Sequence, residues 1–364
     1  MDSSHLQSFI DSNQNYISIF KENNFKINKN SKLNLILVKN YYDKPLSFTN
    51  DNDYWKMYCR GAIINTNTNK VICLPPIKAT EIKIDETIHH NDTTEYQSLV
   101  DGTMINLFYH QNQWIISTRS EIGGYNKWNN RKSFQQLFNE CSTINYDNLN
   151  TQYSYSFVMR HTENRNISPI YQNELYLVEV YSYENNLIQR LPINLYPQND
   201  FLLIDSTNQK DQLLNFFKDP QSTPYFCKGF TIKQGNKRFK YINPHFNYVK
   251  DLKMNHNNPS LTYIHLRQNG NLKHFLNYFP EYQHQFNQCR DNIHQLSNEL
   301  YSIYKNVFIH KQTKKNEIPY HLKPLVYDIH KLYLENKKPT SWEDIKIYIH
   351  SLPPKKLLFA LNYT

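Results

Sequence analysis

Glycine is scarce in this sequence. The 364 residues include only seven, namely Gly61, Gly102, Gly123, Gly124, Gly229, Gly235 and Gly270. A chain with so few glycines keeps them where a side chain cannot be accommodated, such as a tight turn, a backbone with positive φ or a close approach to a ligand. The first six fall in segments whose residue pattern is typical of strands and turns. We therefore expect the glycines to mark constrained points of the backbone.

Paired cysteines and long apolar runs are missing as well. The five cysteines are Cys59, Cys73, Cys141, Cys227 and Cys289, and no two form a C-x-x-C pair. An odd, widely spaced set predicts neither a disulfide framework nor a zinc site, and fits a reducing, cytoplasmic compartment. No run approaches the roughly 18 apolar residues of a membrane span, and the N-terminus lacks the pattern of a secretory signal. We expect no membrane partner.

Several common catalytic motifs are absent. The sequence contains no P-loop, no G-x-G-x-x-G, no H-E-x-x-H and no G-x-S-x-G. His89 and His90, with Asp85 and Asp92 nearby, form a cluster of residue types that can bind a metal. Adjacent histidines rarely share one metal, and the stretch has the composition of a polar loop. We therefore expect no metal site.

Positive charge and aromatic residues are plentiful. Lys and Arg number 41 against 32 Asp and Glu, which gives a formal net charge of +9, and there are 29 Tyr and 20 Phe. A basic surface attracts polyanions, so composition alone makes RNA, DNA or an anionic membrane candidate partners. Tyr and Phe can stack on bases, but they also fill cores. Composition alone leaves open a protein that is merely basic.

Hydrophobic periodicity divides the chain in two. Strand-like and hairpin-like segments predominate up to about residue 250, with short helices predicted near 133–141 and 211–219. Beyond that point the spacing is helical, for example at Phe286, Ile293, Leu296 and Leu300, and Ser341 with Asp344 resembles a helix N-cap. We predict an α+β domain with antiparallel sheets over 1–255 and an α-helical domain over 256–364.

Short motifs follow one another in a definite order between residues 55 and 250. They are Arg60-Gly61, Leu99-Val100-Asp101-Gly102-Thr103, Tyr155-Ser156-Phe157-Val158 with Asn164-Arg165, Lys228-Gly229-Phe230, and Lys240-Tyr241-Ile242 before Asn243-Pro244. This order resembles the covalent nucleotidyltransferases, which include the mRNA capping enzymes, and within them the phage-type RNA ligases. The C-terminal region resembles the helical extension of RNA-ligase-like proteins of large DNA viruses. The resemblance implies a nucleotidyltransferase fold followed by helices.

The chain departs from that family at four positions. Leu99 stands where the family has the lysine that attacks the α-phosphate of ATP, and leucine is no nucleophile. Ser156 and Lys228 replace two carboxylates, and Ile242 replaces a phosphate-binding lysine. A lysine in place of a metal-organising glutamate repels Mg²⁺. The resemblance therefore implies a relative without catalytic residues and without ATP or Mg²⁺ as cofactors, so we lean away from an enzyme.

The residues retained in these motifs are suited to binding. We predict that the former nucleotide cleft binds RNA, with a phosphorylated or capped 5′ end as a candidate target. The predicted site residues are Arg60, Asp101, Arg119, Phe157, Arg165, Lys228, Lys233 and Lys240. Phe157 would stack on a base, although its strand position is equally typical of a core residue. Each cation taken singly is also typical of a solvated surface.

Two other functions stay in competition with this one. The first is an active ligase that uses ATP and Mg²⁺ with a relocated nucleophile, for which Lys83 in Lys83-Ile84-Asp85-Glu86 is the candidate. The second is a protein-interaction scaffold that acts through the helical domain. The lysine-rich run at 311–317 has the composition of a solvated loop, although it could contact RNA phosphates.

Overall fold

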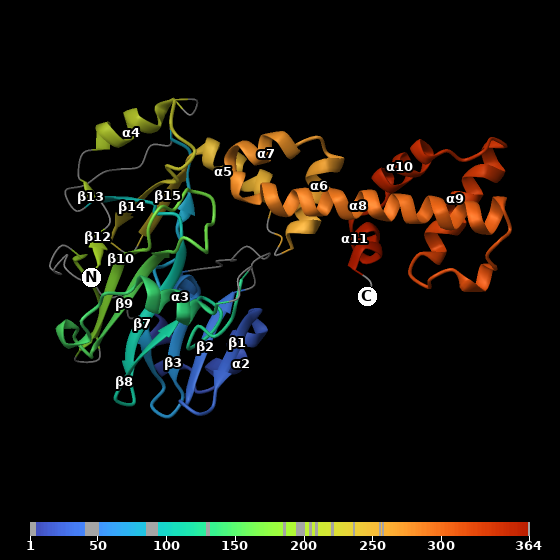
Figure 1. Ribbon diagram of the computed structural model, residues 1–364. Helices are drawn as coiled ribbons and strands as arrows, with labels where there is room; N and C mark the ends of the chain where they lie inside the picture. The colour runs from blue at the N-terminus through green and yellow to red at the C-terminus, as the bar shows by residue number, and fades with distance from the viewer. Residues whose placement is uncertain are drawn as a thin grey trace. The chain divides into compact units, whose positions relative to one another are not determined.

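The computed structural model divides the chain into two compact units, Met1–Tyr248 and Val249–Thr364. The sequence pattern predicted this boundary a few residues later, after residue 255. Figure 1 labels helices and strands of both units. The structure describes residues 5–40, 51–84, 94–128, 132–184, 187–193, 201–203, 206–207, 210–219, 222–235, 237–254, 256 and 258–362. His89, His90, Asp85 and Asp92 lie outside these ranges.

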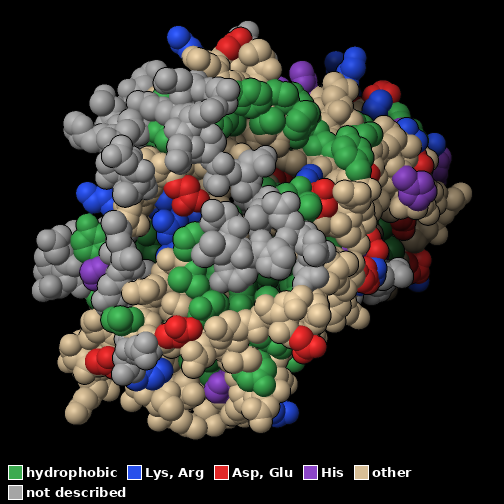
Figure 2. Space-filling view, turned by 90° about the vertical axis from the view of Figure 1, so that its left-hand side faces the viewer, with side chains coloured by type: hydrophobic (Ala, Val, Ile, Leu, Met, Phe, Trp, Pro, Cys, Tyr) green, Lys and Arg blue, Asp and Glu red, His purple; other side chains and the backbone are tan. Residues whose placement is uncertain are grey.

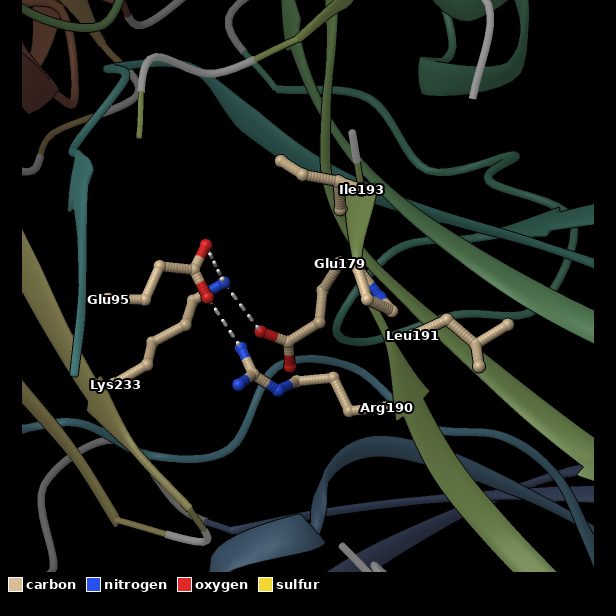
Figure 3. A pocket seen from close by; sticks show the side chains of 7 residues that line it. Glu95, Glu179, Arg190, Leu191, Ile193 and Lys233 are labelled. Carbon is tan, nitrogen blue, oxygen red and sulfur yellow. Dashed lines mark hydrogen bonds and ion pairs between the residues drawn. The ribbon is translucent and has the colours of Figure 1, made fainter. Parts of the chain in front are cut away.

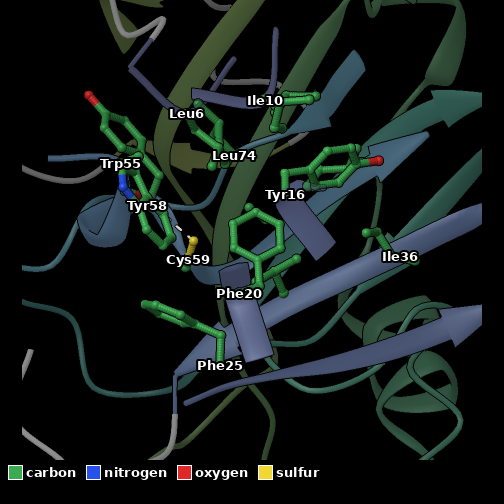
Figure 4. Close-up of a cluster of buried hydrophobic side chains, with 14 of the residues drawn as sticks. Leu6, Ile10, Tyr16, Phe20, Phe25, Ile36, Trp55, Tyr58, Cys59 and Leu74 are labelled. Carbon is green, nitrogen blue, oxygen red and sulfur yellow. Dashed lines mark hydrogen bonds between the residues drawn. The ribbon is translucent and has the colours of Figure 1, made fainter. Parts of the chain in front are cut away.

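The first sheet of the N-terminal unit is a four-stranded antiparallel meander. Its strands are β1 (Phe25–Asn30), β2 (Leu35–Asn40), β3 (Arg60–Asn65) and β4 (Lys70–Cys73), in that order. Helices α1 (His5–Ser12) and α2 (Tyr16–Glu22) and the 3-10 helix η1 (Asp51–Tyr58) pack on it. Aromatic side chains fill the space between, with Phe20 and Trp55 at 5.5 Å between ring centroids (Figure 4). This layer supplies Arg60 to the site described below.

The second sheet of the N-terminal unit has six strands. Its strands run β11 (Leu187–Leu191), β10 (Glu174–Glu184), β9 (Tyr153–Arg160), β7 (Thr103–His110) and β8 (Gln113–Ser117), all antiparallel, and β12 (Leu202–Leu203) pairs with β10 in parallel. Helix α3 (Phe134–Cys141) begins at a capping box of Ser133 and Gln136, and its apolar side packs on one face. The opposite face of the sheet lines the cavity described in the next subsection.

One irregularity in this sheet matters for the site. The pairing of β10 with β9 shifts register between Leu177 and Glu179, as in a β-bulge. Leu177 and Val180 therefore both enter the core beside α3. Val178 packs on Val158 on the opposite side, and Glu179 enters a cluster of charged residues.

The third sheet is built around a hairpin. Its order is β13 (Ser206–Thr207), β6 (Glu95–Ser98), β14 (Gly229–Gln234), β15 (Lys237–Ile242) and β5 (Thr80–Glu81), with only the last pair parallel. Helix α4 (Lys210–Lys218) places Phe217 against Phe230 and Tyr241. Gly229 has φ +137°, and a Cβ there would meet the Tyr241 carbonyl, so this position requires glycine.

The C-terminal unit is helical within its described residues. The helices are α5 (Pro244–Lys253, which begins before the division), α6 (Pro259–Gln268), α7 (Leu272–Tyr278), η4 (Pro280–Tyr282), α8 (Gln283–Tyr304), the π-helical turn η5 (Lys305–Ile309), η6 (Lys315–Glu317), α9 (Lys323–Asn336), α10 (Trp342–Ser351) and α11 (Pro354–Asn362). The predicted stripe on α8 is buried, and Ser341 caps α10 with Asp344. The predicted fold class, α+β with antiparallel sheets and C-terminal helices, is confirmed.

Within the described residues, no helix combines the length and the apolar character that crossing a membrane requires.

Candidate functional site

A cationic cavity of about 310 Å³ lies in the N-terminal unit. Its wall comes from the second and third sheets, from the segment after β4 and from the start of β3. Among the residues that the structure describes, five cations line it, namely Arg60, Arg119, Lys228, Arg238 and Lys240. The unit as a whole is almost neutral, with 25 Lys and Arg against 23 Asp and Glu. On the face of the molecule drawn in Figure 2, basic and acidic side chains are interspersed. The gathering of cations is therefore local to the cavity.

Strand alternation decides which side chains reach the cavity. Met104 and Asn106 of β7 and Val158 of β9 line it. Phe157 does not: it is fully buried in the core on the other face, together with Tyr155. The prediction that Phe157 lines the cleft is wrong, because residues two apart on a strand share a face and both of these aromatics belong to the core.

Leu99 forms part of the cavity wall directly after β6. Its backbone N–H donates to the Gly229 carbonyl at 2.9 Å, which fixes this turn against the third sheet. Nearby, a Cβ on Gly102 would lie only 2.5 Å from the Met159 carbonyl oxygen, so the close approach of this turn to β9 requires glycine. The position that the resemblance assigns to the nucleophile is therefore occupied by an apolar side chain.

Asp101 holds a loop in place and neutralises one cation. Its carboxylate accepts hydrogen bonds from the backbone N–H groups of Ile167 (2.8 Å) and Ser168 (3.0 Å), and its other oxygen lies 3.5 Å from Lys228 Nζ. Lys228 Nζ also lies 5.7 Å from the centre of the Phe246 ring. Asp101 is itself buried, so it acts on the cavity through Lys228 rather than by lining it.

Lys78 is a cation that the sequence motifs did not mark. Burial lowers its pKa, and the charges of Arg60, Arg119 and Lys240 lower it further. The neighbouring Ile77 and Ala79 line the cavity. No local pattern distinguishes Lys78 in the sequence, since its role depends on cations brought together from three other strands or loops.

Lys83, the predicted relocated nucleophile, is exposed. Its neighbours Ile82 and Ile84 pack on the apolar cluster of the third sheet, while Lys83 between them is left to solvent. Lys240, by contrast, lines the cavity and pairs with Glu81 at 2.8 Å.

Asn106 contributes a hydrogen-bond donor at the cavity wall. The side chain is fully buried, and its Oδ1 accepts a hydrogen bond from Ser156 Oγ at 2.9 Å. Its Nδ2 has no hydrogen-bond partner among the described residues. A buried polar group without a partner costs about 1–3 kcal/mol, so it is retained most readily where a ligand satisfies it.

Lys233 belongs to a second, smaller cavity of about 120 Å³, not to the cleft (Figure 3). Its Nζ lies 3.3 Å from Glu179 and 4.0 Å from Glu95, while Arg238 donates to Glu179 at 2.8 Å and Arg190 to Glu95 at 3.3 Å. These five residues, which we call the ion cluster, join β6, β10 and β11 to the β14–β15 hairpin. Arg238 links the ion cluster to the cationic cavity, because it lines the latter.

Charge balance explains the pKa values of the ion cluster. Burial raises the pKa of Glu179, but Arg238, Lys233 and Arg190 outweigh burial and hold the pKa at about 2. Burial lowers the pKa of Lys233 to about 8, with Arg238 and Arg190 opposing the carboxylates Glu179 and Glu95. With three cations and two carboxylates, the ion cluster carries one excess positive charge, and Lys233 is the residue that can lose it.

Arg165 also lies away from the cavity wall. Its guanidinium donates to the Ile167 carbonyl at 3.0 Å and to the Tyr225 hydroxyl at 3.3 Å, so it organises the loop that Asp101 holds. Of the eight predicted site residues, the structure brings Arg60, Arg119, Lys228 and Lys240 to the cavity. It places Asp101, Phe157, Arg165 and Lys233 elsewhere.

One cluster in the described residues has the composition of a metal site. The ligand atoms of Glu140, His161 and Glu163 lie within 4.8 Å of one another. Lys132 Nζ already pairs with both carboxylates, at 2.8 and 2.6 Å. His161 Nδ1 accepts from the Glu163 N–H, so Nε2 carries the proton that it donates to Glu140. The Lys132 ammonium group therefore already supplies positive charge to the two carboxylates, as a metal ion would.

The chain has solved structural neighbours, but no protein-family model matches it and no curated protein matches it. One neighbour is a protein from Aquifex aeolicus assigned as an ATP-dependent DNA ligase, with a TM-score of 0.44 and 12% identity over 80% of each chain. An archaeal ATP-dependent RNA ligase is similar in two forms. Form 2 has a TM-score of 0.46 and 10% identity over 70% of this chain and 65% of that one, and form 1 has 0.43 and 10% over 72% and 67%. Similarity at this level does not define a function, which depends on the residues of the chain's own site.

Proposed function

We propose that this protein binds RNA without forming a covalent intermediate, through the phosphates of an RNA end held in the cationic cavity. The observation that carries the proposal is the gathering of Arg60, Arg119, Lys228, Arg238 and Lys240 around one cavity whose wall includes Leu99. Guanidinium and ammonium groups are the usual protein partners of phosphate. A phosphorylated or capped 5′ end offers more negative charge at one point than an internal nucleotide does.

The size of the cavity favours an end over a duplex. Ligand pockets span roughly 300–1,000 Å³, and the volume here, about 310 Å³, is at the lower end of that range. It suits one nucleotide with its phosphates. Asn106 Nδ2 would then donate to a phosphate or base acceptor, which would satisfy the amide that lacks a partner.

We expect the purified protein to bind 5′-phosphorylated RNA and to form no covalent adduct with ATP or GTP in Mg²⁺ or Mn²⁺. The adduct is sought as label that survives denaturing electrophoresis, beside an active ligase as control. Binding is measured by fluorescence anisotropy over a salt series, and log Kd should rise with log salt concentration by about 0.7 per phosphate contact.

Two outcomes would contradict this proposal. Binding that stays constant as salt rises would exclude phosphate recognition. A labelled band would identify an enzyme, and its loss in Lys78→Ala or Lys83→Ala would locate the nucleophile. Lys78 is the stronger candidate for that alternative, because its lowered pKa and its position beside cavity cations suit an attacking amine.

The double substitution Asn106→Leu with Ser156→Ala separates binding from stability. Replacing both partners of a buried hydrogen bond is close to neutral, and it removes the unsatisfied amide, so the free energy of unfolding should be unchanged or rise by about 1 kcal/mol. RNA affinity should fall about tenfold, since a hydrogen bond to a charged group contributes roughly 1.5–3 kcal/mol. Urea unfolding and anisotropy measure the two effects. A purely structural Asn106 would instead give lower stability with unchanged affinity.

A further inference from the structure

Most of the chain's excess charge resides in the helical unit. Val249–Thr364 has sixteen Lys and Arg against nine Asp and Glu, which is a net charge of +7 out of the +9 of the whole chain. Eight of these lysines fall between residues 305 and 338, where only three acidic residues occur, namely Glu317, Asp328 and Glu335. This stretch runs from the π-helical turn η5 through η6 and α9. Its local net charge of +5 is what a polyanion would encounter.

The same stretch presents a row of partly exposed rings, which we call the ring ladder. Phe308 of η5 stacks on His330 of α9, with centroids 3.8 Å apart and planes inclined by 13°. Tyr327 and Phe308 form a T-shaped pair with centroids 5.9 Å apart, and Tyr333 stacks beside His330 at 5.9 Å. Tyr327 and Tyr333 are each 39% exposed. The aromatic rings at intervals of three along α9 are therefore partly exposed rather than buried in the interior.

Lysines flank the ring ladder. Lys315 Nζ lies 5.4 Å from the centre of the Phe308 ring, and Lys314 and Lys311 precede it in the exposed turn after η5. Lys331 follows His330 on α9, and its ion pair with Glu335 of the same helix is exposed and therefore of little strength. Partly exposed aromatic rings and neighbouring ammonium groups are the two elements of single-strand recognition.

We propose that the ring ladder and its lysines form a binding platform for single-stranded nucleic acid, on which bases stack and phosphates are neutralised. The proposal extends the proposed function to a second surface and shares with it only the class of ligand. It requires neither the cavity nor a 5′ end. An acidic protein would satisfy the lysines but would not require exposed aromatic rings, and a duplex would satisfy the lysines while keeping its bases stacked internally.

The test compares full-length variants for binding to a short single-stranded RNA without a 5′ phosphate. Tyr327→Leu with Tyr333→Leu keeps apolar bulk on α9 and removes stacking, and should weaken binding at least tenfold, since each stacked base contributes roughly 1–3 kcal/mol. Lys314→Gln with Lys315→Gln should weaken binding and lower the salt dependence. The matched control, Lys273→Gln with Lys355→Gln, removes the same charge from exposed positions of the same unit and should change little.

The choice of probes distinguishes single-stranded nucleic acid from the two alternative ligands, an acidic protein and a duplex. An oligonucleotide made only of abasic sites should bind the Tyr variant and the unaltered protein equally, and duplex RNA and poly-glutamate should bind more weakly than single-stranded RNA. The proposed platform would be contradicted if the Tyr variant bound RNA as tightly as the unaltered protein does, or if poly-glutamate competed fully with single-stranded RNA. Cavity variants are measured in parallel on 5′-phosphorylated RNA, so that failure of the cavity and failure of the platform give different results.

Discussion

Replacing Glu179 with leucine should lower the free energy of unfolding by about 3–5 kcal/mol, because it leaves buried cations without their counter-charge. Glu179 is fully buried and accepts from Arg238 at 2.8 Å and from the Tyr181 hydroxyl at 2.7 Å, with Lys233 at 3.3 Å. Urea unfolding followed by circular dichroism measures the change. The control is Glu335→Leu, which breaks an exposed pair with Lys331 and should cost less than about 0.5 kcal/mol. Similar losses for both substitutions would show that the ion cluster is no more important than a surface pair.

The ion cluster also predicts how stability depends on pH. The folded pKa of Glu179 is about 2, below its ordinary 4.5, so its contribution is complete above 4.5 and is lost as pH falls toward 2. Lys233 has a folded pKa of about 8, below its ordinary 10.5. Between those values the unfolded chain holds more protons, so this residue makes stability rise with pH from about 8 upward. Lys233→Met should remove that rise and leave a weaker acid limb, because Arg238 and Arg190 still lower the pKa of Glu179 while Lys233 no longer does.

Removing two cavity cations should have the second large effect, on RNA affinity. In Lys228→Met with Lys240→Met, binding of 5′-phosphorylated RNA should weaken by about tenfold or more at low salt. The slope of log Kd against log salt should fall by about 1.4, since each single-strand phosphate contact contributes roughly 0.7. The lost charges lie on opposite strands of the β14–β15 hairpin region and line one cavity. Anisotropy over a salt series gives both quantities.

The control for that experiment removes the same charge from elsewhere in the N-terminal unit. Lys29 and Lys32 are exposed near the β1–β2 turn and do not line the cavity. Lys29→Met with Lys32→Met should leave both the affinity and the salt slope almost unchanged. Equal losses in the two double variants would mean that RNA senses only the overall charge of the protein, and the cavity would lose its assigned role.

Local patterns predicted much of the fold. The helical spacing of 133–141 and the Ser341–Asp344 signal each correspond to a capped helix in the structure, because side-chain caps and apolar periodicity act over one or two turns. Alternation should also have placed Phe157 in the core. Tyr155 and Phe157 share one face, and the small Ser156 between them faces Asn106.

Long-range pairing is what the sequence did not reveal. Lys233 and Lys240 lie on adjacent strands and look alike in the sequence, yet Lys233 meets Glu179 and Glu95 in the interior while Lys240 lines the cavity. Both side chains lie on the same face of the third sheet, so the difference depends on which residues of the rest of the fold lie opposite each position. Lys78 was missed for the same reason, since its environment is assembled from residues far away along the chain.

The register shift in β10 has a consequence for how this gene could change in length. Because Val178 is the extra residue opposite β9, a deletion of that one codon would leave a regular strand. Glu179 would then follow Leu177 directly and keep its side chain on the face away from α3, opposite Ser156, so Arg238 and Lys233 would retain their shared carboxylate. The deletion would thus remove the part of the cavity wall that Val178 supplies and its packing on Val158 while leaving the ion cluster in place, so we expect it to weaken ligand binding more than folding.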